Sequence, residues 1–474
     1  MKHLHADLAV IGAGSGGLSV ASGAAQLGLR VVLFERGEMG GDCLNFGCVP
    51  SKALISAAKA AHDAATSAAI GVDARPQVDF SRVMDHVHAV IAGIAPHDSQ
   101  ERFEGLGVVV IRQSAAFVGP RTVEGDDVRV TARKIVVATG SRPRAPSIEG
   151  LDNVPYLTNE TVFSLTAAPR RLVILGAGPI GLELGQAFRR LGSEVVVIEQ
   201  GQALMREDRE MAADVLDQIA RDGVEVLEGA AVSRIGRRPD GVELSVTQNG
   251  RQIEIEGSHL LVAAGRAPNL EDLNLEAAGV RFDARGIVTD RRLRSVSNRA
   301  VFAVGDVAGR GAFTHVAGAQ ASLVIRKALF AQPIDADALI APRVTYTDPE
   351  IAGVGLTEGE AIERHGEGVR IVRSRFADND RARAEADTRG GAKLILDRRG
   401  RLLGASIVGR QAGDLIQPWV LAMTAGLKVR DMTAVVAPYP TRGEINKRVA
   451  GEVFTPLLFS KATRRLVRIL KHLG

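Results

Sequence analysis

The fold is decided near the start of the chain, where the sequence reads Asp7-Leu8-Ala9-Val10-Ile11-Gly12-Ala13-Gly14-Ser15-Gly16-Gly17. A strand-like run leads into glycines at 12, 14 and 17, and an alanine-rich helical stretch follows to Leu27. Gly12, Gly14 and Gly17 allow a tight turn and let backbone amides approach a pyrophosphate at the helix N-terminus. A second strand, 30–34, ends in Glu35, whose carboxylate can accept hydrogen bonds from an adenosine ribose. This arrangement predicts a dinucleotide site.

The same arrangement occurs a second time. A strand, 171–175, precedes Gly176-Ala177-Gly178-Pro179-Ile180-Gly181, a helix runs to about Leu191, and the next strand, 194–198, ends in Glu199. Two dinucleotides are therefore expected on an α/β chain with two doubly wound, Rossmann-like domains. No Lys or Arg follows Glu199 until Arg206, and a carboxylate there favours the free 2′-hydroxyl of NAD(H) over the 2′-phosphate of NADP(H).

The chain has only two cysteines, Cys43 and Cys48, in a glycine-rich stretch that ends at Lys52. Pro50 suits a first helical turn, and the alanine-rich run after it predicts that Cys48 lies at a helix N-terminus. The partial positive charge of the backbone amides there favours a thiolate. The alternative is two buried cysteines that act as small apolar residues. The surrounding glycines and the immediate helix start favour a redox pair.

Composition narrows the class of protein. The 474 residues are enough for about three domains, and 46% hydrophobic with 24% charged residues is typical of globular proteins. The net charge is only +4, with basic and acidic residues interleaved up to the C-terminal segment, which argues against a nucleic-acid-binding protein. No apolar run reaches membrane-spanning length, and strand-like sequence from Leu8 leaves no room for a signal peptide. We expect a cytoplasmic enzyme.

Three further motifs complete a family pattern: Ala138-Thr139-Gly140-Ser141-Arg142-Pro143, Gly265-Arg266-Ala267-Pro268-Asn269 and Val301-Phe302-Ala303-Val304-Gly305-Asp306. With the cysteine stretch and both glycine motifs, the chain resembles the pyridine nucleotide-disulfide oxidoreductases from about residue 5 to 455. The resemblance implies a flavoprotein in which hydride passes from NADH to FAD and electrons pass to a Cys43–Cys48 disulfide and then to an acceptor. It implies that Cys48 contacts the flavin and that Cys43 attacks the acceptor.

The resemblance also implies roles for other residues. FAD binds at the first glycine motif, Asp306 binds its ribityl and phosphate region, and Lys52 lies near the flavin paired with Glu183. The cofactor-binding residues expected are Gly12, Gly14, Gly17, Glu35, Lys52, Thr139, Gly140 and Asp306, together with Gly176, Gly178, Gly181, Glu199 and Gly265. No metal-binding residues are predicted.

Domain limits follow from the repeats and the glycine junctions. Residues 1–150 and 271–341 are expected to form a split FAD-binding domain, with 151–270 inserted as the NAD(P)-binding domain. Beyond Pro342, strand-like runs such as 392–397 and 402–408 predict antiparallel hairpins, followed by a helix over 412–426. The C-terminal domain, 342–474, is therefore expected to be an α+β dimerisation domain, and in the family this domain forms a homodimer and completes the partner's active site.

The C-terminal motif departs from the commonest family pattern. Thiol-converting members have His-Pro-Thr-x-x-Glu, whereas this chain has Tyr439-Pro440-Thr441-Arg442-Gly443-Glu444. A phenol with a pKa of about 10 is a poor base at neutral pH, so Tyr439 is expected to donate a proton or hydrogen bond. Tyr439 and Glu444 join Cys43, Cys48, Lys52 and Glu183 as catalytic candidates. Mercuric reductases also have a tyrosine at this position.

The acceptor is left open by the sequence. Mercuric reductases carry a C-terminal cysteine pair, but this chain has only Cys43 and Cys48 for a soft ion. The alternatives are a small disulfide, a thiophilic metal ion such as Hg(II), or a quinone-like acceptor. Dihydrolipoamide dehydrogenase activity is disfavoured by the missing histidine. A non-catalytic, membrane-associated FAD-carrying scaffold is disfavoured by the intact motifs.

The C-terminal segment, 456–474, ends in a basic amphipathic pattern. At helical spacing it has Leu466, Ile469, Leu470 and Leu473, with Arg464, Arg465, Arg468 and Lys471 between them. Such a helix over 461–473 fits peripheral contact with an anionic membrane face or docking on the protein's own core, and the sequence leaves both open.

Overall fold

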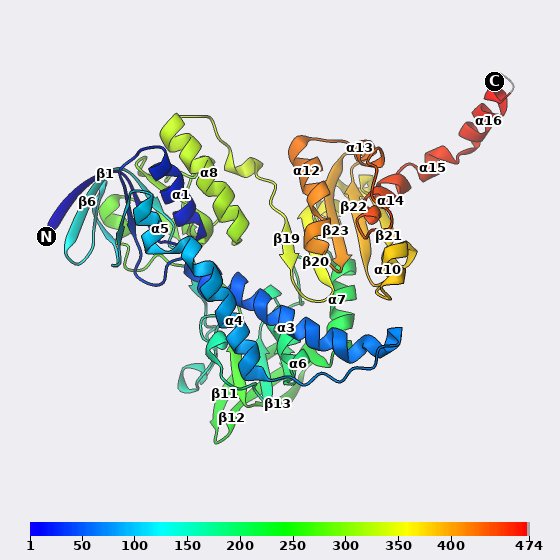
Figure 1. Cartoon of the computed structure of the whole chain (residues 1–474), viewed down its shortest axis with the longest axis horizontal. Helices are drawn as coiled ribbons and strands as arrows, with labels where there is room; N and C mark the ends of the chain where they lie inside the picture. The colour runs from blue at the N-terminus through cyan, green and yellow to red at the C-terminus, as the bar shows by residue number, and fades with distance from the viewer. Residues whose placement is uncertain (472–474) are drawn as a thin grey trace.

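A computed structural model describes residues 1–471. Its first sheet has the strand order β3-β2-β1-β6-β5-β4, and β18 also pairs with β6. The strands are β1 (Lys2–Ile11), β2 (Val31–Phe34), β3 (Val108–Ile111), β4 (Ala116–Gly119), β5 (Thr122–Glu124), β6 (Val128–Val137) and β18 (Val301–Ala303). β1, β2, β3, β6 and β18 pair in parallel, and α1 (Ser15–Gln26) packs beside α8 (Thr314–Phe330) on this sheet (Figure 1).

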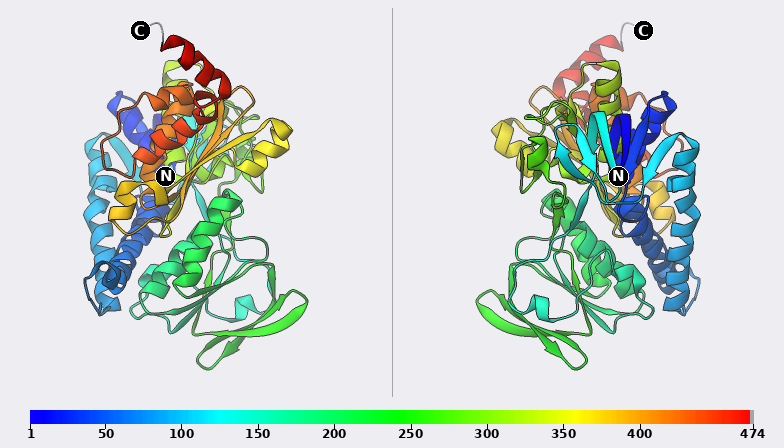
Figure 2. Two further views of the ribbon diagram at one scale, coloured as in Figure 1. Left: turned by 90° about the vertical axis from the view of Figure 1, so that its right-hand side faces the viewer. Right: turned by 90° about the vertical axis from the view of Figure 1, so that its left-hand side faces the viewer.

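The second sheet repeats this design on a smaller scale. It is fully parallel, with β10 (Val224–Leu227), β9 (Glu194–Ile198), β8 (Arg171–Leu175) and β14 (His259–Val262) in that order. α6 (Pro179–Arg190) and α7 (Arg209–Arg221) lie against it. An antiparallel meander of β11 (Ala230–Arg238), β12 (Gly241–Gln248) and β13 (Arg251–Gly257) shares a hydrophobic cluster with the sheet and extends below it in Figure 2. The chain is therefore of the α/β class with two Rossmann-like units, as predicted.

The third sheet is antiparallel, with order β19-β20-β23-β22-β21. Its strands are β19 (Arg343–Thr345), β20 (Glu350–Gly355), β21 (Arg370–Arg375), β22 (Gly391–Leu396) and β23 (Leu402–Gly409). The predicted single helix over 412–426 is wrong: the chain forms α11 (Ala412–Leu415) and α12 (Gln417–Ala425), separated at Ile416. Pro418 lacks the backbone N–H that would continue the helix, so a new helix begins around it.

The two cysteines lie on two consecutive helices. Cys43 is in α2 (Gly41–Asn45), and Cys48 is in α3 (Cys48–Thr66). α3 packs on α4 (Phe80–Ile94), which lies beside it, and on α6 of the second unit (Figure 1). Cys48 is the first residue of α3, which confirms its predicted place at a helix N-terminus. The cysteines therefore lie where the two nucleotide-binding units meet.

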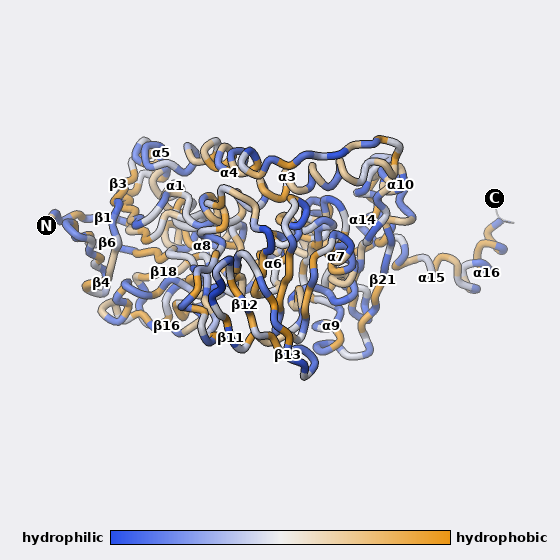
Figure 3. Tube along the Cα trace, turned by 90° about the horizontal axis from the view of Figure 1, so that it is seen from below, coloured by the Kyte–Doolittle hydropathy of each residue, from blue (hydrophilic) through white to orange (hydrophobic). Residues whose placement is uncertain are grey.

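The chain ends in two short helices that stand away from the rest of the molecule. α15 (Thr455–Leu458) and α16 (Lys461–Leu470) project beyond the third sheet in Figures 1 and 3. No residue of α16 is buried, so this helix does not dock on the core of its own chain. Leu473, the last apolar residue of the predicted pattern, lies outside the described residues. Within residues 1–471, no helix is both long and apolar enough to cross a bilayer.

Candidate active site

The first glycine loop is shaped by close backbone contacts. Gly12 has φ +102°, and a Cβ there would lie 2.5 Å from the carbonyl oxygen of Ala138. A Cβ on Gly17 would lie 1.8 Å from the carbonyl oxygen of Gly12, so neither position accepts a side chain. Gly14 differs, because a Cβ there would meet no atom within 4 Å. The middle glycine therefore opens onto free space at the N-terminus of α1.

The second loop repeats these contacts. A Cβ on Gly176 would lie 2.6 Å from the carbonyl oxygen of Ala263, and one on Gly181 would lie 1.9 Å from that of Gly176. Gly178 again opens onto free space, at the N-terminus of α6. Both loops thus fit a pyrophosphate, with backbone amides and a helix N-terminus facing the opening.

The acids that follow each loop support it directly. Glu35 accepts hydrogen bonds from the backbone N–H groups of Ala13 (2.6 Å) and Gly37 (2.7 Å). Glu199 does the same for Ala177 (2.9 Å) and Gly201 (2.8 Å). Sequence reasoning assigned these carboxylates to ribose only. Each oxygen can accept a further hydrogen bond, so the support of the loop and the contact with a ribose are compatible.

The two cysteines are free thiols, Cys43 half-buried and Cys48 exposed. The pKa of Cys48 is lowered to about 6, first by the hydrogen bond from Cys43 and then by contacts with Thr314 and the charge of Lys52. Together these effects outweigh burial, which raises the pKa. The same hydrogen bond, together with burial, raises the pKa of Cys43. At neutral pH the pair therefore holds one thiolate, on Cys48, and one thiol.

Thr314 is a site residue that sequence reasoning missed. It begins α8, and its Oγ1 lies 3.5 Å from Sγ of Cys48. A hydroxyl next to the sulfur stabilises the thiolate form. Nothing in the local sequence marks Thr314, because the contact joins residues that are far apart along the chain.

The structure brings together Lys52 and Glu183. Nζ of Lys52 lies 2.7 Å from Oε2 of Glu183, whose side chain is only 6% exposed. The backbone N–H of Tyr346 donates to Oε1 of Glu183 at 2.9 Å, and Nζ of Lys52 lies 4.4 Å from the centre of the Tyr346 ring. Lys52 is thus held one turn after Cys48 on α3. Tyr346, which sequence reasoning did not assign to the site, supports both partners.

Asp306 lies just after β18, in the 3-10 turn Gly305–Ala308. It accepts a hydrogen bond from the hydroxyl of Ser141. Ser141 accepts in turn from Nε of Arg266 at 2.8 Å, and Nη2 of Arg266 lies 3.2 Å from Asp42, which precedes Cys43. This chain of contacts links the Asp306 turn to the helix that carries Cys43.

Two of the other predicted cofactor residues, Thr139 and Gly140, pair with Asn269. Thr139 donates from Oγ1 to the carbonyl oxygen of Asn269 at 2.7 Å, and the backbone N–H of Asn269 donates to Gly140 at 3.0 Å. Gly265 precedes β15 (Arg266–Pro268), which pairs with β7 (Ser141–Pro143). These residues form the junction between the two nucleotide-binding units.

Tyr439 and Glu444 lie apart from the cysteines. With Asp380 and Arg448 they line a cavity of about 370 Å³ beside α10 (Asp380–Ala384) and α14 (Glu444–Glu452). Glu444 accepts a hydrogen bond from the backbone N–H of Thr441 at 3.3 Å. Among residues 1–471, no hydrogen bond or ion pair joins Tyr439 or Glu444 to Cys43 or Cys48.

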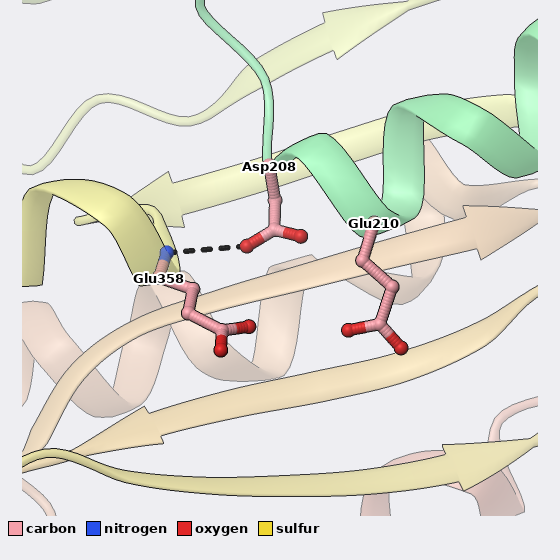
Figure 4. A group of neighbouring side chains, drawn as sticks. All are labelled: Asp208, Glu210 and Glu358. Atoms are coloured by element: carbon pink, nitrogen blue, oxygen red, sulfur yellow. Dashed lines mark hydrogen bonds between the residues drawn. The ribbon is translucent and has the colours of Figure 1, made fainter. Parts of the chain in front are cut away.

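A cluster of carboxylates elsewhere has a different role. Asp208, Glu210 and Glu358 converge between α7 and α9 (Glu358–His365), and the backbone N–H of Glu358 donates to Asp208 (Figure 4). The ammonium of Lys393 lies 2.6, 2.6 and 2.7 Å from these carboxylates. Lys393 already provides the positive charge, so the cluster is an ion-pair network that joins the second and third sheets.

Two family models match the chain. The model described as "Pyridine nucleotide-disulphide oxidoreductase" matches residues 6–321, and the model for the dimerisation domain of these proteins matches residues 341–450. A mercuric reductase of Lysinibacillus sphaericus is 34% identical over 92% of this chain and 81% of that protein. A dihydrolipoyl dehydrogenase of Geobacillus stearothermophilus is also 34% identical, over 94% and 96%.

A solved structure is similar over nearly the whole chain. It is the Cu(II) complex of the HOCl-induced flavoprotein disulfide reductase RclA from Escherichia coli, which is 27% identical to this chain. The alignment covers 94% of this chain and 100% of that one, with a TM-score of 0.84. The likeness therefore extends from the nucleotide loops through the third sheet.

Proposed function

The chain belongs to the pyridine nucleotide-disulphide oxidoreductase family, and from that premise we propose that it reduces a thiophilic metal ion with electrons from NADH. The family consists of flavin-dependent enzymes that use NAD(P)H, which excludes a non-catalytic scaffold. When bound, FAD supplies a two-electron relay between the nicotinamide and the cysteine pair. The acceptor, the choice of NADH and the roles of individual residues are our proposals.

We propose that residues 1–150 and 271–341 bind FAD through the first glycine loop and Asp306. The 151–270 segment binds NADH through the second loop. Among the described residues, no Lys or Arg forms an ion pair with Glu199, which supports NADH over NADPH. Lys52, held by Glu183, provides a fixed positive charge near the cysteines.

The acceptor proposal rests above all on the ionisation of Cys48. Soft metal ions bind thiolates in preference to oxygen or nitrogen ligands, and the Cys48 thiolate lies beside the Cys43 thiol that attacks the acceptor. Oxidation of the Cys43 thiol and the Cys48 thiolate to a disulfide releases two electrons and one proton. Two electrons reduce one Hg(II) to Hg(0) or two Cu(II) to Cu(I), and the hydride of NADH restores the thiol and the thiolate without a further proton.

Tyr439 supports a metal over a thiol substrate. A dithiol substrate needs a base to remove its proton, and the hydrogen bond with Asp380 raises the pKa of Tyr439 further. The phenol therefore remains protonated at neutral pH. The name of the mercuric reductase relatives and the Cu(II) in the RclA complex are consistent with a metal acceptor.

The match to the dimerisation domain supports a homodimer. We propose that Tyr439 and Glu444 of each subunit complete the cysteine site of the other, because they do not contact the cysteines within one chain. We also propose a cytoplasmic location, with peripheral contact at the inner membrane face through residues 461–473.

The test combines an NADH titration with a panel of acceptors. Anaerobic addition of NADH to the holoenzyme should produce a long-wavelength band beside the flavin absorbance, and Cys48→Ser should abolish it. Hg(II) or Cu(II) should then accelerate NADH oxidation at least tenfold more than lipoamide or a quinone, and only with both cysteines present. Equal quinone reduction by wild type and Cys48→Ser, with no metal-dependent rate, would replace the proposal with a flavin-to-quinone reaction. A dominant lipoamide rate would indicate dihydrolipoyl dehydrogenase activity.

A further inference from the structure

The C-terminal helix α16 has two separate faces. At 3.6 residues per turn, its apolar residues fall within an arc of about 160°, and they are Ala462, Leu466, Val467, Ile469 and Leu470. The opposite face carries the basic residues Lys461, Arg464, Arg465 and Arg468, continued by Lys471. The large apolar side chains are exposed by 51% to 62%. The helix therefore presents a broad apolar face to solvent.

The apolar surface continues into α15. Leu457, Leu458 and Phe459 are exposed as well. Ser460 then caps α16, because its Oγ accepts a hydrogen bond from the backbone N–H of Thr463 at 3.2 Å. The N-terminus of α16 is thus capped by a residue of its own chain.

The charge of this segment is uniform. No acidic residue follows Glu452 in the sequence. Within the described residues, none of the five cations of this segment forms an ion pair with the rest of the chain. A protein groove would have to cover the apolar face and also supply acids to the opposite one. A lipid surface satisfies both faces at once, with acyl chains for the apolar side chains and anionic headgroups for the cations.

We propose that α15 and α16 bind an anionic lipid surface, with α16 lying in the plane of the headgroups. Leu466, Ile469 and Leu470 would enter the acyl boundary. A helix of ten residues is about 15 Å long, half the thickness of the hydrocarbon core, so it lies on the membrane and does not span it. The inference rests on the peripheral contact proposed above and is independent of the redox reaction. The projection of both helices beyond the third sheet leaves them accessible to such a surface (Figure 3).

The test is co-sedimentation of the full-length holoenzyme with phosphatidylcholine vesicles, with and without one quarter phosphatidylglycerol. Binding should require phosphatidylglycerol and weaken as salt is raised. Each Lys or Arg near an anionic surface contributes about fivefold in affinity, so Arg464→Glu/Arg468→Glu should weaken binding at least tenfold. Leu466→Asp/Leu470→Asp should abolish it. The control Arg398→Glu/Arg399→Glu makes the same charge change on the exposed turn between β22 and β23 and should bind like wild type.

Three results would overturn the inference. One is equal binding to neutral vesicles, and another is equal weakening by the control. The third is loss of the dimer in the tail variants, measured by light scattering, because it would make α16 a contact between subunits. NADH-driven reduction should be unchanged in every variant, so failure of vesicle binding is distinguishable from failure of the redox proposal.

Discussion

Tyr439 donates a hydrogen bond from its phenolic oxygen to Oδ2 of Asp380 across 3.0 Å. The bond and the negative charge of Asp380 raise the pKa of Tyr439. The phenol is 71% exposed, so it remains accessible to a partner subunit or a substrate. The hydroxyl of Tyr439 therefore keeps its proton at neutral pH.

Substitution of Tyr439 should separate the two halves of the reaction. Tyr439→Phe keeps the ring but loses the hydroxyl, so metal-dependent NADH oxidation should fall about tenfold, which corresponds to the loss of one hydrogen bond of about 1.4 kcal/mol beside the acceptor. Reduction of the bound flavin by NADH, followed in a stopped-flow instrument without acceptor, should be unchanged. Tyr439→His supplies an imidazole and should add dihydrolipoamide activity that rises as the pH passes about 6.5. Full metal activity in Tyr439→Phe would remove Tyr439 from the site.

Asp380→Asn should lower the pKa of Tyr439 towards its ordinary value, because the amide keeps a hydrogen-bond acceptor but loses the charge. The chain has only three tyrosines, so phenolate absorbance near 295 nm can be followed against pH. The difference between each protein and its Tyr439→Phe counterpart isolates Tyr439. Identical titration of the Asp380→Asn variant and wild type would show that the bond does not form in solution.

The thiolate of Cys48 should depend on its two neighbours. Its pKa of about 6 is set first by the hydrogen bond from Cys43 and then by Thr314. In the NADH-reduced enzyme, alkylation of Cys48 by iodoacetamide should therefore have its midpoint near pH 6. Cys43→Ala should move the midpoint up towards 8.5, and Thr314→Val should move it up by a smaller amount. Thr314→Ser keeps the hydroxyl and is the matched control. A midpoint that stays near pH 6 in Cys43→Ala would show that Cys43 does not set the shift.

The nucleotide loops could be predicted from sequence because their determinants are local. Gly12, Gly14 and Gly17 lie within six residues of one another, and the strand and helix around them follow directly in the chain. The contacts of Cys48 with Thr314 and of Arg266 with Asp42 could not be predicted in this way, because only tertiary packing brings these residues together. The family resemblance supplied the pairing of Lys52 with Glu183, but not the place of Tyr346 between them.

The break between α11 and α12 did have a local signal. Pro418 stands inside the segment 412–426 that the sequence predicts as one helix, and a proline there removes one backbone hydrogen-bond donor. The exposure of α16 had no such signal, because an amphipathic pattern does not show what covers its apolar face.

Lys393 should be essential for stability. It is 1% exposed and lies among three carboxylates, so Lys393→Met leaves uncompensated buried negative charge and should lower the free energy of unfolding by about 3–5 kcal/mol.

Hydrogen bonds from Arg373 and then Lys393 lower the pKa of Glu210 from 4.5 to about 2. The stabilisation by Glu210 is therefore complete above pH 4.5 and is lost as the pH falls towards 2. Denaturant unfolding at pH 7 and pH 3 measures both effects. The exposed Lys2→Met is the control, and equal stability of the two variants would contradict the role of the network.

The two middle glycines offer a test that distinguishes the two dinucleotide sites from each other. Gly14 has φ −80° and Gly178 has φ −77°, which alanine adopts without strain, and a Cβ at either position meets no protein atom within 4 Å. Gly14→Ala should therefore fold but lose FAD, because its methyl group occupies the space in which the pyrophosphate would bind. Gly178→Ala should stay yellow, with its KM for NADH raised at least tenfold. The ratio of flavin to protein absorbance and steady-state kinetics measure the two effects. In contrast, Gly17→Ala places a Cβ 1.8 Å from a carbonyl oxygen and should fail to fold. Loss of FAD in Gly178→Ala but not in Gly14→Ala would reverse the assignment of the two sites.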